Sequence, residues 1–125
     1  MATNQSLMTK LNLENVMTLQ LEVDTAASHN IISQTCFEDL QLALKKNNKG
    51  RTKKLDRGVK IRLADGSMAT QECPVVQIHV SIELDKFTNP TPLTFLIVDG
   101  PNNLMGRYAL ELLFPAEFAN FQNVM

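Results

Sequence analysis

The stretch Met17-Thr-Leu-Gln-Leu-Glu-Val-Asp-Thr-Ala-Ala-Ser28 decides the fold of this chain. It joins a segment in which apolar and polar residues alternate to an aspartate followed by small residues. Apolar and polar residues alternate from Met17 to Val23, which predicts a half-buried β-strand. The strand leads directly into Asp24 and a cluster of small residues, a composition that suits a tight turn. A carboxylate is therefore expected at the end of a largely apolar strand.

Asp24 carries the clearest chemistry in the sequence. Two carboxylates a few ångströms apart share a proton, because like charges so close together cannot both ionise. Such a pair can hydrolyse a peptide bond: one group activates water and the other donates a proton. A chain of 125 residues holds one such motif, so a second copy would have to supply the partner carboxylate across a two-fold axis. In the alternative interpretation, Asp24 only caps a turn through its side chain.

The segments that follow predict further strands and two helices. Residues 30–33 indicate a short strand, and residues 34–46 an amphipathic helix capped by Ser33 or Gln34. Residues 59–63 and 75–84 alternate as strands do, and the Asp-Gly pair between them is a strong hairpin signal. Residues 93–98 are largely apolar, which predicts a strand buried on both faces. Residues 106–113 predict a short helix that ends before Pro115.

One segment, residues 45–60, is strongly basic. It contains eight of the twelve Lys and Arg residues of the chain. Together with Asn47, Asn48 and Gly50, this composition predicts a solvated loop. The sharper alternative is a local contact for nucleic acid or for an acidic substrate. No aromatic residues are interleaved with the basic ones, so a surface for stacking bases is not indicated and nucleic acid is not the expected partner.

Length, charge and cysteine content limit the other functions. The chain has 125 residues and a net charge of −1, which indicates a single domain spanning 1–125 and no overall attraction for nucleic acid. Its apolar runs are shorter than the ~20 residues that a membrane span needs. Cys36 and Cys73 lack paired ligand spacing, so we interpret them as reduced thiols, with one disulfide as the alternative. We expect an intracellular protein with no metal, no cofactor and no membrane segment.

Three segments occur in an order typical of one protein family. Leu21-Glu-Val-Asp-Thr-Ala-Ala-Ser28 is similar to the apolar-Asp-Thr-Gly-Ala-Ser signature of retropepsins, the aspartic proteases of retroviruses and long-terminal-repeat retrotransposons. Residues 28–33 continue it as in gypsy-type elements. Residues 59–80 resemble the flap hairpin, and residues 95–110 resemble the second signature with its Gly-Arg pair and C-terminal helix. The resemblance covers about residues 13–115. It implies an all-β fold: a small closed barrel with a flap hairpin and one or two short helices.

The resemblance implies roles for the residues of the first signature. Asp24 would pair with its symmetry mate and activate the water. The Thr25 hydroxyl would hydrogen-bond across the dimer and fix the two turns, since a buried hydroxyl needs a partner. Ala26 and Ala27 would line the cleft beside the scissile bond, and Ser28 would also contact the substrate.

The other two segments would complete the site. The flap tip would close over the substrate and exclude water, a role that falls to Ala64, Asp65, Gly66 and Ser67. Gly106 would allow a close backbone approach behind the turn. Arg107 would anchor that turn and the edge of the dimer. The termini, residues 1–12 and 116–125, would form the sheet between the two subunits.

Two positions depart from the family pattern. Ala26 stands where Gly is usual, so its methyl group narrows the cleft, strains the loop if the position needs a positive φ, or is tolerated. Ser28-His29 stands where many retroviral enzymes have the aspartate that pairs with Arg107.

From the resemblance we expect an aspartic endopeptidase that is active as a homodimer. Its substrate would be a Gag-Pol-type polyprotein, and it would work in the cytoplasm or within virus-like particles. The alternative is a catalytically impaired retropepsin-like domain that serves for dimerisation or peptide binding.

Overall fold

The computed structural model describes residues 7–50, 52–60, 72–82, 90–116 and 119. The flap tip expected at Ala64, Asp65, Gly66 and Ser67 lies outside the described residues, and so do 1–6 and 120–125 of the two terminal segments.

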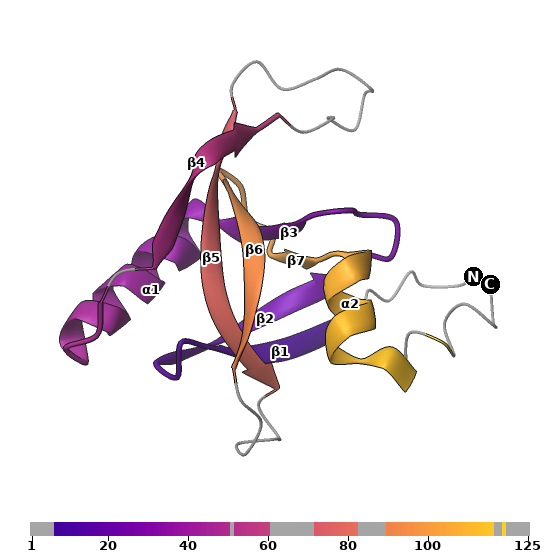
Figure 1. Ribbon diagram of the computed structural model, residues 1–125, viewed down its shortest axis with the longest axis horizontal. Helices are drawn as coiled ribbons and strands as arrows, with labels where there is room; N and C mark the ends of the chain where they lie inside the picture. Colours follow the sequence, from indigo (N-terminus) through magenta and orange to yellow (C-terminus); the bar gives the residue numbers. More distant parts are fainter. Residues whose placement is uncertain (1–6, 51, 61–71, 83–89, 117–118, 120–125) are drawn as a thin grey trace.

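The described strands form one sheet that closes on itself (Figure 1). Along the sheet they follow the order β1-β2-β7-β3-β6-β5-β4, and a further pairing between β1 and β5 closes the ring. Strand β4 pairs with β5 but does not belong to this ring, so it is an edge strand of the sheet. The prediction of an all-β closed barrel with two short helices is therefore confirmed. The strands are β1 (Met8–Leu13), β2 (Met17–Val23), β3 (Asn30–Ser33), β4 (Lys53–Val59), β5 (Cys73–Ile82), β6 (Thr91–Val98) and β7 (Leu104–Met105).

Strand β1 was not expected from the sequence, which places residues 1–12 in an intersubunit segment. In the structure it pairs antiparallel with β2 over its whole length and with β5 from Leu11 to Leu13. Leu11 and Leu13 are fully buried in the barrel. Residues 8–12 thus belong to the barrel of their own chain, because their alternate leucines fill its interior.

Strand β4 corrects the prediction of a loop over residues 45–60. Residues 47–52 connect the first helix to β4, which pairs antiparallel with β5 at residues 53–55 and again at Val59, with a shift of register between them. Edge strands commonly carry lysines, because their side chains reach solvent while the backbone forms the ladder. Both Lys53 and Lys54 are exposed. A basic composition therefore did not exclude a strand here.

The two described helices lie on opposite sides of the barrel (Figure 1). Helix α1 (Gln34–Lys46) begins after Ser33, whose hydroxyl accepts a hydrogen bond from the Cys36 N–H at 3.2 Å. It buries Phe37, Leu40 and Leu44 against the barrel. Helix α2 (Arg107–Leu113) begins after Gly106 and buries Ala109 and Leu110.

The core lies inside the closed sheet, and its side chains hold in place the strands next to the Asp24 turn. Phe95 on β6, Ile32 on β3, Leu21 on β2 and Met105 on β7 are almost fully buried and belong to one apolar cluster. Burying each such side chain contributes about 1.5–3 kcal/mol. These residues lie in the strands around the turn at Asp24, so the core holds the backbone that presents this carboxylate.

Candidate active site

Asp24 begins a compact turn at the end of β2. Its carboxylate oxygen Oδ1 accepts a hydrogen bond from the Ala26 N–H at 3.0 Å, and its carbonyl oxygen accepts one from the Ala27 N–H at 3.1 Å. The side chain is half-buried, so part of the carboxylate remains accessible. The turn-capping role that aspartate often takes is thus carried by Oδ1.

Strand β7 fastens this turn to the barrel. It runs parallel to β2 and antiparallel to β3. The Asp24 N–H donates to the Met105 carbonyl at 3.0 Å, and the Arg107 N–H donates to the Ala27 carbonyl at 2.9 Å. Both ends of the turn are therefore bonded to one short segment, which limits the positions that the Asp24 carboxylate can take.

Gly106 lies directly against this turn. A Cβ atom added to it would lie 2.8 Å from the His29 carbonyl oxygen and 2.9 Å from the Ala27 carbonyl oxygen. Real Cβ atoms do not approach backbone oxygens so closely, so a glycine is needed for the approach. The φ of Gly106 is −81°, which any residue can adopt. Glycine is therefore favoured at position 106 because there is no room for a Cβ atom, and not because of its backbone conformation.

Two asparagine side chains also hold the segments around the turn together, and the sequence interpretation missed both. The Asn30 Oδ1 accepts from the Gly106 N–H at 2.8 Å, and its Nδ2 donates to the Thr94 carbonyl at 3.0 Å. The Asn103 Oδ1 accepts from the Ser33 N–H at 2.8 Å, and its backbone carbonyl accepts from the Glu22 N–H at 2.9 Å. The only available signal was an amide residue beside an apolar strand, which does not reveal its partner.

Ala26 sits in the turn without backbone strain. Among the described residues, the non-glycine positions with positive φ are Glu14, Asn15 and Asn48. The backbone at Ala26 therefore does not demand glycine. Its side chain is exposed, so the methyl group projects from the turn and does not pack beneath it.

Arg107 contributes to the turn through its backbone rather than its side chain. Its guanidinium donates to the Tyr108 hydroxyl at 3.3 Å and lies 5.0 Å from the centre of that ring. Arg107 and Tyr108 are both exposed. The expected anchoring of the turn is thus made in this single chain by the Arg107 N–H, and an anchoring role for the guanidinium at a dimer edge stays a prediction.

A small cavity of about 290 Å³ lies beside the end of the turn, at residues 28–30. Ser28 opens onto it and is exposed, whereas Thr25 is half-buried and does not line it. Its wall combines residues from the end of the turn, the start of β3, β6 and α2, namely Ser28, His29, Asn30, Pro92, Leu93, Thr94, Leu96, Tyr108, Ala109 and Leu112.

The other titratable side chains form no second centre in the described residues. No group of three or more His, Cys, Asp or Glu there is placed to hold a metal ion. Both cysteines are free; burial raises the pKa of the Cys73 thiol, which makes it a poor nucleophile. His79 points outward from β5 and contacts the Glu14 carboxylate, Nδ1 to Oε2, at 3.0 Å. The described helices include none that is long and apolar enough to cross a membrane.

Comparison with solved structures identifies the fold. The chain superposes on the structure of EIAV protease complexed with the inhibitor HBY-793 with a TM-score of 0.63. The two sequences are 19% identical, and the match covers 89% of this chain and 92% of that one. Comparisons with protein-family models and with curated protein sequences found no match. The chain therefore has a retropepsin-like fold.

Proposed function

We propose that this chain is an aspartic endopeptidase whose active form is a homodimer, with Asp24 from each copy forming the catalytic pair. One chain supplies one such carboxylate, so the site is complete only when two turns meet. In the pair, one carboxylate takes a proton from the attacking water and the other donates a proton to the peptide.

The turn itself is the observation that carries this proposal. Asp24 stands half-accessible at the end of β2, in a retropepsin-like fold, on a turn bonded at both ends to residues 105–107. A capping aspartate without catalytic duty needs no such support, since its hydrogen bond to the Ala26 N–H already satisfies the turn. A carboxylate that must meet its symmetry mate at a short distance has to be held rigidly, and these bonds provide that.

The resemblance in sequence suggests the finer details. The substrate would be a Gag-Pol-type polyprotein, cleaved in the cytoplasm or in virus-like particles. Thr25, Ala26, Ala27 and Ser28 would surround the scissile bond, Arg107 would secure the edge of the dimer, and residues 64–67 would cover the substrate.

The dimer requirement predicts a concentration dependence. Specific activity on a mixed peptide library is expected to fall steeply as the protein is diluted below its dimer dissociation constant, because monomers hold one carboxylate each. Cleavage rates over a dilution series measure the specific activity, and sedimentation of the same samples measures the fraction of protein that is dimeric. A specific activity that stays constant where sedimentation shows monomers would contradict the homodimeric site.

The alternative, a catalytically impaired domain for dimerisation or peptide binding, depends on Ala26. We expect Ala26→Gly to change the cleavage rate by less than about tenfold, because the Ala26 backbone is unstrained and its side chain is exposed. The same peptide assay on both proteins measures this. A gain far above tenfold, or cleavage only in the glycine variant, would favour the impaired domain.

A further inference from the structure

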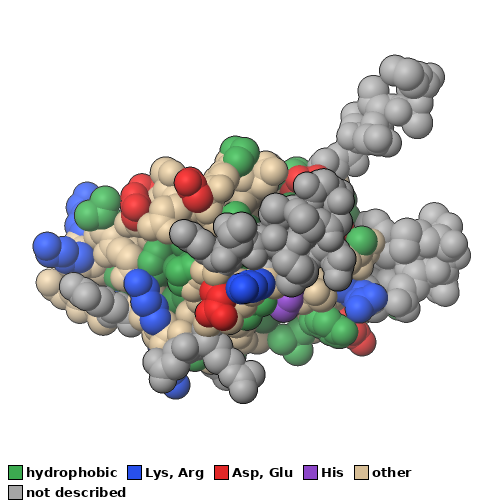
Figure 2. Space-filling view, turned by 90° about the horizontal axis from the view of Figure 1, so that it is seen from above, with side chains coloured by type: hydrophobic (Ala, Val, Ile, Leu, Met, Phe, Trp, Pro, Cys, Tyr) green, Lys and Arg blue, Asp and Glu red, His purple; other side chains and the backbone are tan. Residues whose placement is uncertain are grey.

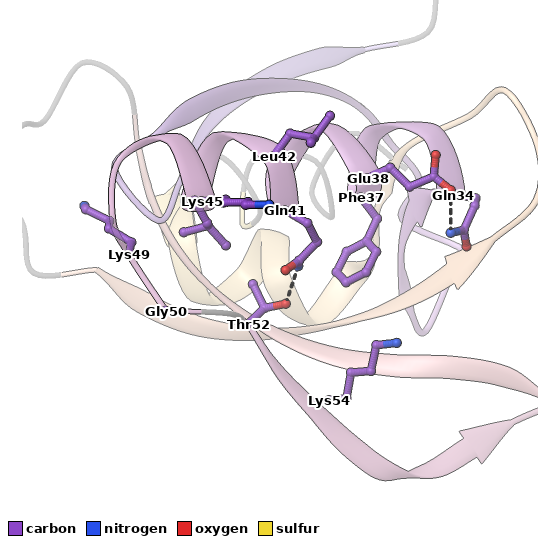
Figure 3. Close-up of a pocket in the computed structure, with 11 residues that line it drawn as sticks. Gln34, Phe37, Glu38, Gln41, Leu42, Lys45, Lys49, Gly50, Thr52 and Lys54 are labelled. Atoms are coloured by element: carbon purple, nitrogen blue, oxygen red, sulfur yellow. Dashed lines mark hydrogen bonds between the residues drawn. The ribbon is translucent and has the colours of Figure 1, made fainter.

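A groove separate from the Asp24 turn runs between α1 and the beginning of β4 (Figure 3). The groove has a volume of about 840 Å³. It shares no lining residue with the Asp24 turn or with the smaller cavity beside that turn. In Figure 1, α1 and β4 lie on one side of the barrel, whereas β2 ends towards α2 on the other. A ligand in this groove would therefore leave the region of Asp24 free.

The groove has an apolar floor and a charged rim. Phe37 and Leu44 are almost fully buried at its base, and Leu42 on the rim is 66% exposed. Across the groove, the Gln41 Nε2 donates to the Thr52 Oγ1 at 2.7 Å, which ties α1 to the start of β4. The apolar surface that a ligand can reach in this groove is therefore mainly that of Leu42, and it lies beside charged and polar groups.

Positive charge stands on both walls of the groove. Lys45 on α1 and Lys54 on β4 both line the groove, and Figure 3 shows the ammonium group of Lys54 directed towards α1. The Lys49 ammonium, at one end, already donates to the Glu14 carbonyl at 3.1 Å. Figure 2 shows Lys and Arg side chains next to hydrophobic ones on the surface of the molecule. The groove should therefore attract negative charge.

The charge is not uniform along the groove. Glu38 lies at the opposite end from Lys49, where Gln34 Nε2 donates to its Oε1 at 3.0 Å. A ligand with acidic side chains near Lys45 and Lys54, and none at the Glu38 end, would be favoured in one orientation.

Strand β4 adds a reason for an extended ligand. It is the last strand of the sheet and pairs only with β5 among the described residues, so its second edge can receive another strand. An extended peptide has side chains on alternate sides, so apolar residues can face the floor while acidic ones face the rim. A nucleic acid fits less well, because the described lining holds no exposed aromatic ring for base stacking.

We propose that this groove binds an extended, acidic polypeptide segment of another molecule through Lys45 and Lys54, independently of cleavage at Asp24. The exposed Leu42 contacts an aliphatic side chain of the segment, and the two ammonium groups pair with carboxylates.

The test uses a fluorescent seven-residue peptide in which leucine and glutamate alternate, which matches the length of β4. Binding is followed by fluorescence anisotropy in an Asp24→Asn background, so that hydrolysis cannot consume the probe and the outcome does not depend on the proposed function. The double variant Lys45→Glu/Lys54→Glu is compared with Lys46→Glu/Lys53→Glu. The control pair carries the same charge change on immediately neighbouring, exposed residues that do not line the groove.

We expect the groove variant to weaken binding by about tenfold or more and the control to change it by less than about twofold. Glu38→Gln should tighten binding about twofold, and replacing the peptide's glutamates with glutamines should weaken it as the groove variant does. Equal losses in both double variants, or no binding by the unaltered groove, would overturn the proposal. A labelled single-stranded oligonucleotide that binds more tightly than the peptide, with the same sensitivity to Lys45 and Lys54, would overturn it in favour of nucleic acid.

Discussion

Replacing Asp24 with asparagine is expected to reduce peptide cleavage by about 10⁴-fold or more. In a homodimer both catalytic positions change together, and an amide can neither take a proton from water nor donate one as a carboxylic acid does. The fold should survive, because the asparagine Oδ1 can still accept the hydrogen bond that Ala26 N–H gives to Asp24. We expect the free energy of unfolding to change by less than about 1 kcal/mol. Initial rates on a cleaved library peptide and urea unfolding of the same samples measure the two effects.

A second variant separates catalysis from turn capping at Asp24. Asp24→Ala removes both the carboxylate and the acceptor for the Ala26 N–H, so it should be as inactive as the asparagine variant and less stable by about 1 kcal/mol. If Asp24 were only a cap, the asparagine variant would match the unaltered protein in every assay. Undiminished cleavage by Asp24→Asn would show that the activity belongs to another group.

The largest effect on stability is expected from Gly106→Ala, which should lower the free energy of unfolding by about 3 kcal/mol. The new methyl group would lie 2.8 and 2.9 Å from the carbonyl oxygens of His29 and Ala27. These are backbone atoms of the turn and of the residue before β3, so they cannot move aside as a flexible side chain can. Chemical denaturation measures the change.

Gly100→Ala is the matched control, because a Cβ atom there would meet nothing within 4 Å. It should leave stability unchanged within about 1 kcal/mol. Gly106→Ala should also reduce cleavage by about 10²-fold under conditions where it remains folded, since a displacement of the turn by about 1 Å misplaces the carboxylate. If the two glycine variants unfold alike, the backbone around Gly106 relaxes freely and does not hold the turn rigidly.

Local patterns in the sequence were sufficient for the elements that lie around the site. The alternation in residues 17–23 gave the correct bounds of β2, and the amphipathic pattern gave those of α1 with Ser33 or Gln34 as its cap, of which the structure has Ser33. Both signals arise from how one element divides its side chains between core and solvent. They succeed because this division is repeated within a few residues of the same segment.

Pairings between distant segments could not be predicted in this way. Strand β4 was expected to be a loop because residues 45–60 are strongly basic and contain Asn47, Asn48 and Gly50, yet its backbone pairs with β5. Strand β1 was missed although Leu11 and Leu13 are buried, since only its pairings with β2 and β5 show where those leucines lie.

The sequence by itself determined that a carboxylate stands at the end of a half-buried strand, in a turn of small residues, within an all-β chain. The tertiary structure decided what holds that carboxylate. Asn30 bonds to Gly106 across a separation of 76 residues, and the Met105 carbonyl receives the Asp24 N–H. The physical reason is that a hydrogen bond between an amide side chain and a distant backbone depends on the approach of two chain segments. That approach is set by the burial of the whole core, and no local sequence pattern records it.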